Sequence, residues 1–226
     1  MSRPKMTASH REQMRENILD SAYSILIEKG PEHISSRAVA EHLDLTHMGL
    51  FTYFPNQVAI LQALSEREQL KTLNQIKLMT TRSGPKNYPI IVEEALRFFQ
   101  KNAEKNPNVF RLAWIKPEMA GEVTDQAHWM QPTIDLMASL ISAGSEQGSF
   151  MVSDPEFAAT MVISMVNMPY ILSYSGKITG SELREKMAQA AISEAMRYLR
   201  MCNKPERDTR MSTWEAIITW VRKKLG

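Results

Sequence analysis

The stretch that decides the expected fold is ISSRAVAEHLDLTHMGLFTYFPNQ, residues 34–57. Ser35 or Ser36 can cap a short helix, because a serine oxygen accepts a hydrogen bond from a free N–H of the first helical turn. Asp44 tolerates the geometry of a tight turn, and Thr46 is a cap candidate for a second helix. The pattern predicts a helix-turn-helix over about residues 34–53.

The second helix of this pair has an apolar side and a polar side. Leu50 and Phe54, four residues apart, should anchor it inward, and Leu45 is placed to pack against Leu50 as a hydrophobic staple. The outward face then carries Thr46, His47, Met48, Gly49 and Tyr53. A recognition helix presents such a face to the major groove of DNA, so the stretch predicts a DNA reader.

Composition sets wide bounds on the remaining chain. With 226 residues, 43% of them hydrophobic and 23% charged, the chain suits one large or two small domains. The formal net charge of +2 is too small to indicate a polyanion partner by itself. The single cysteine, Cys202, excludes an internal disulfide framework and a cysteine zinc site, and it fits a reducing cytoplasm.

Two segments bear on location. No apolar run precedes Ile18, so we expect no signal peptide and a cytoplasmic protein. Residues 157–176 carry no charge and are long enough to cross a bilayer. Thr160, Ser164 and Asn167 recur there at helical spacing, and such a polar stripe suits a helix packed within a protein. We therefore expect no membrane partner.

The rest of the chain indicates an all-α protein. An N-terminal arm to about Arg11 should precede a helix over about 12–29, and Asn56 should cap a long helix that reaches about Met79. Further helices are expected over 88–105, from 107, from Pro132 to about 144, from 155 with Pro169 as a kink or end, over 181–201 and over 212–225. The pattern of residues 118–131 is ambiguous between helix and loop.

These residues resemble the tetracycline-repressor (TetR) family of bacterial transcription regulators. The resemblance is carried by Ile18-Leu19, Ala22, Gly30, Ser35-Ser36-Arg37, Val39-Ala40, Leu45-Thr46, Leu50-Phe51 and Tyr53-Phe54, and more weakly by Gly144, Gly148-Ser149-Phe150 and Asp154-Pro155. It implies an N-terminal helix-turn-helix domain over 1–56, a connecting helix over 57–82, and a helical effector-binding and dimerisation domain over 83–226. It also implies a homodimer on a palindromic double-stranded operator, with a small-molecule effector.

Three positions depart from the family pattern. Asp44 stands where glycine is usual, Phe51 where tyrosine is usual, and Gln57 where a lysine often meets phosphate. Phe51 has no hydroxyl group to donate to a phosphate, and Gln57 carries no charge. The affinity for the DNA backbone should therefore be weaker. Acidic and basic side chains nearly balance up to Pro55, so binding should use helix N-termini, hydroxyls and two copies of the domain.

The sequence suggests two sets of site residues. The candidates for DNA contact are Ser35, Ser36, Arg37, Thr46, His47, Met48, Gly49, Thr52, Tyr53 and Gln57. Arg37 can form bidentate hydrogen bonds to a guanine or a phosphate, or it can be an ordinary surface arginine. The candidates for effector contact are Phe98, Phe99, Phe110, Trp114, Trp129, Met130, Met137, Met161, Ser164, Met165, Asn167 and Met168. A lining rich in methionine suits a lipophilic ligand, although plain core packing explains the same residues.

Other functions fit the sequence less well. Ser83 and Lys86 have the Ser-x-x-Lys spacing but lie in a predicted loop, and Glu122, Asp125 and His128 could form a metal site or simply be solvated. We therefore expect that the protein is not an enzyme and that it binds neither a cofactor nor a metal ion. The sequence favours a ligand-responsive repressor whose DNA affinity falls when a lipophilic effector binds, with the change carried by the long helix. The alternative is a DNA-binding or interaction protein of the same fold without an effector.

Overall fold

The computed structural model describes residues 7–82, 87–115 and 130–201, and within these ranges every regular element is a helix. The all-α expectation is confirmed. The elements are α1 Ala8–Lys29, the short 3₁₀ turn η1 Pro31–His33, α2 Ser36–His42, α3 His47–Phe51, α4 Gln57–Arg82, α5 Tyr88–Lys105, α6 Pro107–Trp114, α7 Gln131–Glu146, α8 Pro155–Tyr174 and α9 Ser181–Met201.

Helix α1 begins earlier than the sequence pattern predicts. The Thr7 hydroxyl oxygen accepts from the backbone N–H of His10 at 3.2 Å, and this cap starts the helix at Ala8. The expected start near Glu12, with an arm reaching Arg11, is therefore wrong. Arg3 and Lys5, expected in the arm, lie outside the described residues. Gly30, at φ 95°, ends α1 with its N–H bonded to the Leu26 carbonyl oxygen.

The helix-turn-helix follows the expected capping. Ser35, not Ser36, caps α2, because its hydroxyl oxygen accepts from the Ala38 N–H at 3.0 Å. Asp44 takes the positive φ of the turn, 52°, and Thr46 caps α3. Leu50 and Phe54 are buried as expected. They join α1, α2 and the start of α4 in an N-terminal core that includes Ile18, Leu26, Val39 and Leu61.

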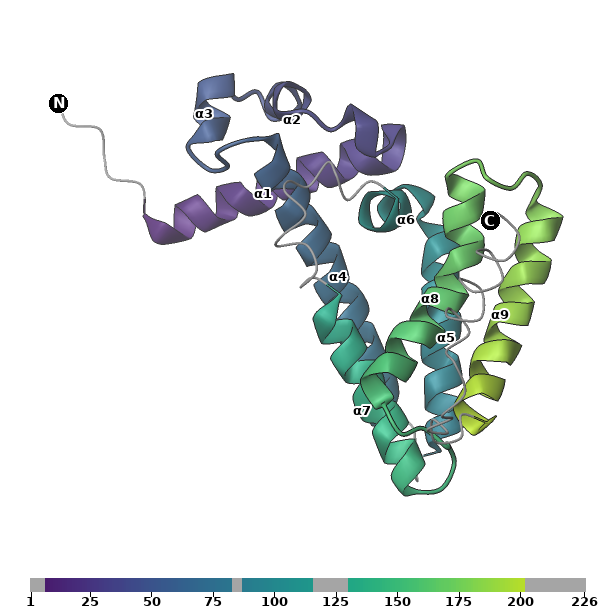
Figure 1. The fold of residues 1–226 in the computed structure, drawn as a ribbon. Helices are drawn as coiled ribbons and strands as arrows, with labels where there is room; N and C mark the ends of the chain where they lie inside the picture. Colours follow the sequence, from purple (N-terminus) through teal and green to yellow (C-terminus); the bar gives the residue numbers. More distant parts are fainter. Residues whose placement is uncertain (1–6, 83–86, 116–129, 202–226) are drawn as a thin grey trace, which may run out of the picture.

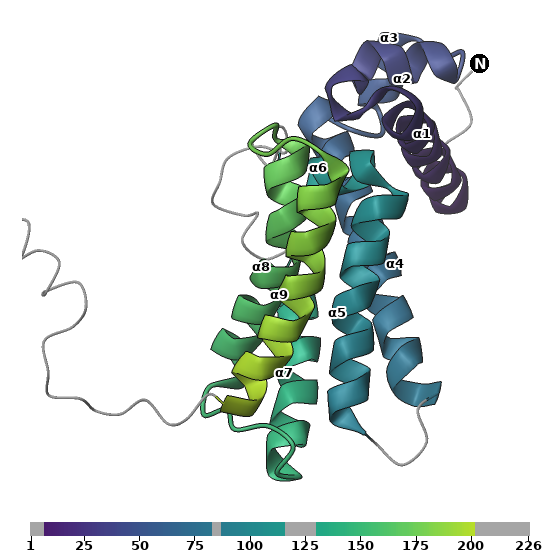
Figure 2. The same cartoon turned by 90° about the vertical axis from the view of Figure 1, so that its right-hand side faces the viewer.

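Helix α4 runs from the N-terminal helices down to the C-terminal ones, where α5 lies beside it (Figures 1 and 2). The C-terminal core is formed by α5, α7, α8 and α9 together with Ile76 of α4. The short α6 lies between the two groups and contacts α1, η1, α4, α5 and α8. Both α4 and α6 therefore connect the helix-turn-helix with the C-terminal helices.

Helix α8 packs against α5, α7 and α9. Its length and composition would suffice to cross a membrane, but 44% of its most apolar stretch is buried inside this protein. Asp154 caps it by accepting from the Phe157 N–H at 3.0 Å. The helix continues through Pro169 to Tyr174, so Pro169 is not its end. The expected helix over 212–225 lies outside the described residues.

Gly144 of α7 gives a test of the C-terminal packing. A Cβ atom at this position would lie 2.4 Å from Cδ2 of Phe150 and 3.1 Å from Cβ of Tyr88. Phe150 is buried, so we expect Gly144→Ala to destabilise the fold by about 1–3 kcal/mol through overpacking. Thermal and urea unfolding measure the loss. The control Ser139→Ala, exposed on the same helix, should change stability by less than about 0.5 kcal/mol; equal unfolding of both variants would contradict this packing.

Candidate DNA-binding face and effector cavity

The start of α3 forms an exposed polar surface. Thr46 Oγ1 accepts from the Gly49 N–H at 3.0 Å, which fixes the first turn of the helix. The imidazole of His47 meets the ring of Phe51 edge-on at 4.5 Å, and Met48 is 77% exposed. Because Leu50 is buried on the opposite side, this surface can meet a groove of DNA without unfolding the domain.

The candidates for DNA contact do not all lie on that surface. Arg37, Thr46, His47, Met48 and Thr52 are exposed, and Ser35 and Gly49 are partly so.

Three others are engaged inside the protein. Ser36 is only 8% exposed, and Tyr53 packs against the N-terminal core beyond the end of α3. Gln57 donates from Nε2 to the carbonyl oxygen of Ile34 at 2.7 Å. Its amide thus joins the start of α4 to the segment before α2. The placement of Tyr53 on the outward face of α3 is therefore corrected, because α3 ends at Phe51.

Arg37 projects from α2 with its guanidinium free to change partner. Its Nε lies 2.9 Å from Oε1 of Glu41, and the two side chains are 85% and 66% exposed. An exposed pair of this kind contributes little stability. The arginine can therefore exchange the carboxylate for a phosphate or a guanine at small cost.

Gly49 leaves the surface beside the cap of α3 open. A Cβ atom there would lie 3.0 Å from Thr46 Oγ1, the atom that caps α3, and would meet nothing else within 4 Å. A side chain at this third helical position is compatible with a serine or threonine cap, so the cap does not by itself require glycine.

Two arginines of α1, absent from the sequence-based candidates, hold the end of α3. Arg15 donates from Nη1 to the Tyr53 carbonyl oxygen at 2.6 Å and lies over the ring of Phe54 at 4.2 Å. Arg11 donates from Nη2 to the Thr52 carbonyl oxygen at 3.3 Å. Their spacing of four residues on a helix was a signal for a shared face. Both contacts orient α3 relative to α1.

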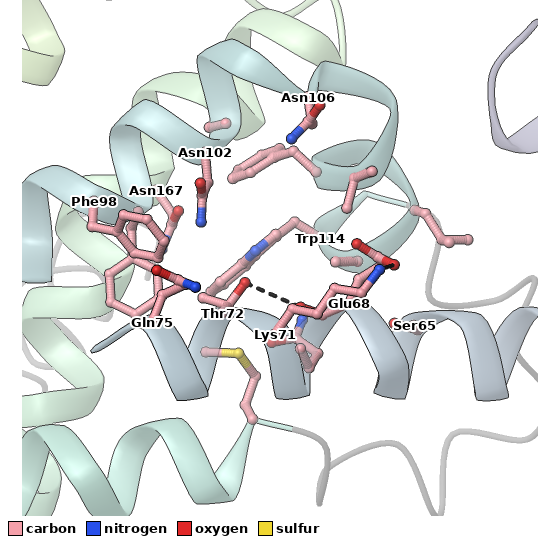
Figure 3. Close-up of a pocket in the computed structure, with 18 residues that line it drawn as sticks. Ser65, Glu68, Lys71, Thr72, Gln75, Phe98, Asn102, Asn106, Trp114 and Asn167 are labelled. Atoms are coloured by element: carbon pink, nitrogen blue, oxygen red, sulfur yellow. Dashed lines mark hydrogen bonds and ion pairs between the residues drawn. The ribbon is translucent and has the colours of Figure 1, made fainter. Parts of the chain in front are cut away.

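A cavity of about 200 Å³ lies between α4, α5 and α6 (Figure 3). Of the candidates for effector contact, it is lined by Phe98, Phe99, Phe110, Trp114, Met130 and Asn167. The structure therefore brings together the four aromatic candidates that it describes, Phe98, Phe99, Phe110 and Trp114.

The other effector candidates do not line this cavity. Met137 is buried in the C-terminal core, and Met161 and Met165 are partly buried on α8. Ser164 and Met168 lie on the exposed face of α8. Of the methionines that the structure describes, Met130 lines this cavity, and effector contact by the other methionines stays a prediction. Trp129 lies outside the described residues.

Sequence reasoning missed the polar wall that α4 contributes. It consists of Ser65, Glu68, Gln69, Lys71, Thr72 and Gln75, and α5 adds Asn102. Positions 65, 68, 72 and 75 recur at helical spacing, so a polar face was visible in the sequence. It resembles a solvated face, and only the packing of α5 and α6 shows that Ser65, Glu68, Gln69 and Thr72 are partly covered, whereas Lys71 and Gln75 stay exposed.

Glu68 connects this cavity with α1 through its neighbour Arg67. The Glu68 carboxylate, 14% exposed, lies 2.7 Å from Lys71 Nζ and 3.6 Å from Arg67 Nε. Arg67 reaches across to α1, where its Nη1 lies 2.8 Å from Asp20 and 3.2 Å from Glu16. Its Nη2 also donates to the Leu19 carbonyl oxygen at 3.2 Å. A change in position of Glu68 would therefore act on the attachment of α4 to α1.

Helix α6 makes a second connection. Leu112 is 4% exposed, belongs to the N-terminal core and lines the cavity. Arg111 Nη2 lies 3.0 Å from a carboxylate oxygen of Glu32, and Asn108 donates to the Ile27 carbonyl oxygen at 3.2 Å. The helix thus contacts the cavity on one side and α1 and η1 of the N-terminal domain on the other.

Aromatic rings of α6 and α8 form a cluster. Phe110 lies between 5.7 and 5.9 Å from the rings of Trp114, Tyr170 and Tyr174. Burial raises the pKa of Tyr170, and its hydroxyl donates to Glu104 at 2.7 Å. Burial likewise raises the pKa of Tyr174. Both phenols therefore stay neutral at physiological pH and serve as packing and hydrogen-bonding groups.

A comparison with known protein families identifies the N-terminal domain. The model of the bacterial regulatory proteins of the tetR family matches residues 18–64, which span α1 to the first part of α4. The N-terminal part of the chain is therefore a TetR-type helix-turn-helix domain. A search of curated protein sequences found no match to this chain.

Solved structures share its fold. A TetR-family transcriptional regulator from Pectobacterium atrosepticum has a TM-score of 0.70 at 18% identity, over 88% of this chain and 100% of that one. The fatty acid degradation regulator FadR from Bacillus halodurans has 0.65 at 14%, over 92% and 98%. The repressor FadR from Thermus thermophilus, in complex with lauroyl-CoA, has 0.61 at 13%, over 82% and 92%.

Arg37→Ala should weaken binding of this protein to DNA by about 1–3 kcal/mol if the guanidinium hydrogen-bonds to a base, without loss of stability. Gel shift and fluorescence anisotropy measure the affinity. The matched control is Arg97→Ala on α5, since Arg97 also pairs with a carboxylate one helical turn away, with its Nε 2.9 Å from Glu93 Oε1. Equal affinities of the two variants would remove Arg37 from the DNA-binding face.

Proposed function

We propose that this protein is a homodimeric repressor that binds a palindromic operator and releases it when a small molecule occupies the cavity between α4, α5 and α6. The observation that carries the proposal is the pair of connections from that cavity to the N-terminal domain, one through Arg67 of α4 to α1 and one through Leu112 of α6 to the N-terminal core. A DNA-binding protein would act in the cytoplasm, and the proposal assigns no catalytic step to the chain.

The homodimer is supported by the outer face of α8. Phe157 and Met168 are 56% and 44% exposed, and Thr160 and Ser164 are exposed between them. No charged side chain interrupts this face from Phe157 to Tyr174. A self-complementary apolar face is what a two-fold dimer interface requires. The polar stripe expected in the sequence is therefore divided: Thr160 and Ser164 lie on this face, and Asn167 lines the cavity.

The effector response follows from the two connections. A molecule between α4 and α6 would push the two helices apart or hold them closer, and both are attached to α1 or η1 by hydrogen bonds. Each copy of α3 would then move relative to its partner. Operator half-sites lie about 34–36 Å apart, so a small change in this spacing would weaken binding of both copies together.

The proposed function is tested by selection of bound sequences from a random duplex pool. We expect inverted repeats with half-sites about one helical turn apart, and log affinity that falls linearly with log salt concentration. The absence of any enriched sequence would overturn the repressor proposal.

Ser164→Arg separates the dimer from the DNA-binding face. A buried arginine at the proposed interface should give a monomer in light scattering and a large loss of operator affinity. Ser9→Arg, exposed on α1, is the matched control and should remain a dimer. A dimeric Ser164→Arg protein would show that the two copies meet elsewhere.

Arg67→Met tests the connection through α4. The apolar part of the side chain is kept, but the contacts to Asp20, Glu16 and Leu19 are lost. We expect the variant to bind an effector unchanged while the effector releases DNA less well, because the coupling free energy between the sites falls. Arg97→Met is the control. Full release of DNA from Arg67→Met by the effector would assign the coupling to other contacts.

A further inference from the structure

The cavity is small and one of its walls is aromatic. At about 200 Å³ it lies below the range of about 300–1,000 Å³ that holds drug-sized ligands. Phe110 and Trp114 are stacked with their planes 17° apart, and Phe98 also lines the space. Aromatic rings pack well against such faces in an offset or edge-on arrangement. The space therefore suits one or two fused rings better than a long chain.

The cavity is also lined by side-chain amides. Gln69 and Gln75 come from α4, Asn102 from α5, Asn106 from the residue between α5 and α6, and Asn167 from α8. In Figure 3, the amides of Gln75 and Asn102 point toward the indole ring of Trp114. Within residues 7–82, 87–115 and 130–201, neither amide is hydrogen-bonded to another residue; Gln75 is exposed and Asn102 is partly buried, so both are accessible to a ligand as well as to water. Each offers both donors and an acceptor, a combination that a ligand hydroxyl group complements.

The charges that line the cavity already neutralise each other. Glu68 is the carboxylate among the lining residues and Lys71 the ammonium group, and they form an ion pair of 2.7 Å. A charged ligand would have to break this pair or lose its hydration without a partner. An uncharged ligand avoids both costs.

We propose that the cavity selects an uncharged, planar aromatic molecule that carries at least two hydroxyl groups. This inference rests on the proposed effector site and names the chemistry of its ligand. The ring lies against Phe110 and Trp114, and the hydroxyl groups exchange hydrogen bonds with Gln75 and Asn102. It replaces the lipophilic effector that the sequence predicts with an amphipathic one.

Four probes on one ring system test the proposal by calorimetric titration of the full chain. They are a dihydroxynaphthalene, naphthalene, naphthoate and (aminomethyl)naphthalene, with all substituents on β carbons. We expect the neutral diol to bind at least about tenfold more tightly than each of the others, as one or two added hydrogen bonds allow. Equal or tighter binding of the acid, the amine or naphthalene would overturn the proposal, and so would the absence of binding by all four.

Asn102→Leu and Gln75→Leu test which side chains recognise the hydroxyl groups. Each should reduce the affinity for the diol about tenfold and leave that for naphthalene unchanged or higher. The matched control is Asn74→Leu, because Asn74 is exposed on α4 next to Gln75 and does not line the cavity. Circular dichroism and the melting temperature verify the fold of each variant. Unchanged diol binding in both amide variants would contradict the assignment.

Binding of the probes is measured without DNA, so the two proposals fail separately. Tight diol binding without release of the selected operator would support the ligand chemistry and contradict the effector role. Release of the operator by one of the charged probes, with no binding of the diol, would support the effector role and overturn the ligand chemistry.

Discussion

Ile60, Leu61 and Leu64 of α4 are buried in the N-terminal core, and Ile76 of the same helix is buried in the C-terminal core. Each core would lose one of its walls if α4 moved freely, so the helix is held at both ends by apolar burial. At about 25 cal/mol per Å² of apolar surface, such burial outweighs any single polar contact of the helix. The position of α4 is thus the constraint on which the helix-turn-helix and the cavity both depend.

Between those two anchored ends, α4 carries polar side chains. Their contacts are the ones that a ligand in the cavity could change. Arg67 turns toward α1 and Glu68 toward the cavity, although they are neighbours in sequence. Helix α6 repeats the arrangement, with Arg111 bonded to Glu32 and Phe110 beside the cavity. A ligand changes the relative stability of two conformations only through contacts that differ between them. These neighbouring pairs provide such contacts at both helices.

The helix-turn-helix was predictable because its determinants are local. Ser35, Asp44 and Thr46 act on backbone groups within a few residues of themselves, so their roles can be read from the sequence. Leu50 followed from helical spacing, whereas Phe54 is buried although α3 ends at Phe51. Thr7 acts as locally as Ser35, but the few apolar residues around it concealed the cap. Gln57 was not predictable in this way, since its partner, the Ile34 carbonyl oxygen, is distant in the sequence.

The sequence by itself determined the helical class, the TetR-like N-terminal domain and the aromatic members of the cavity, because capping, periodicity and apolar content are properties of short segments. Only the tertiary structure decided which polar residues face that cavity. The amides of Gln75 and Asn102 belong to different helices, and a polar helical face reads the same whether water or another helix covers it. The sequence pattern placed Asn167 and Ser164 on one polar stripe of a helix. In the tertiary structure Asn167 lines the cavity, whereas Ser164 is exposed on the outer face of α8.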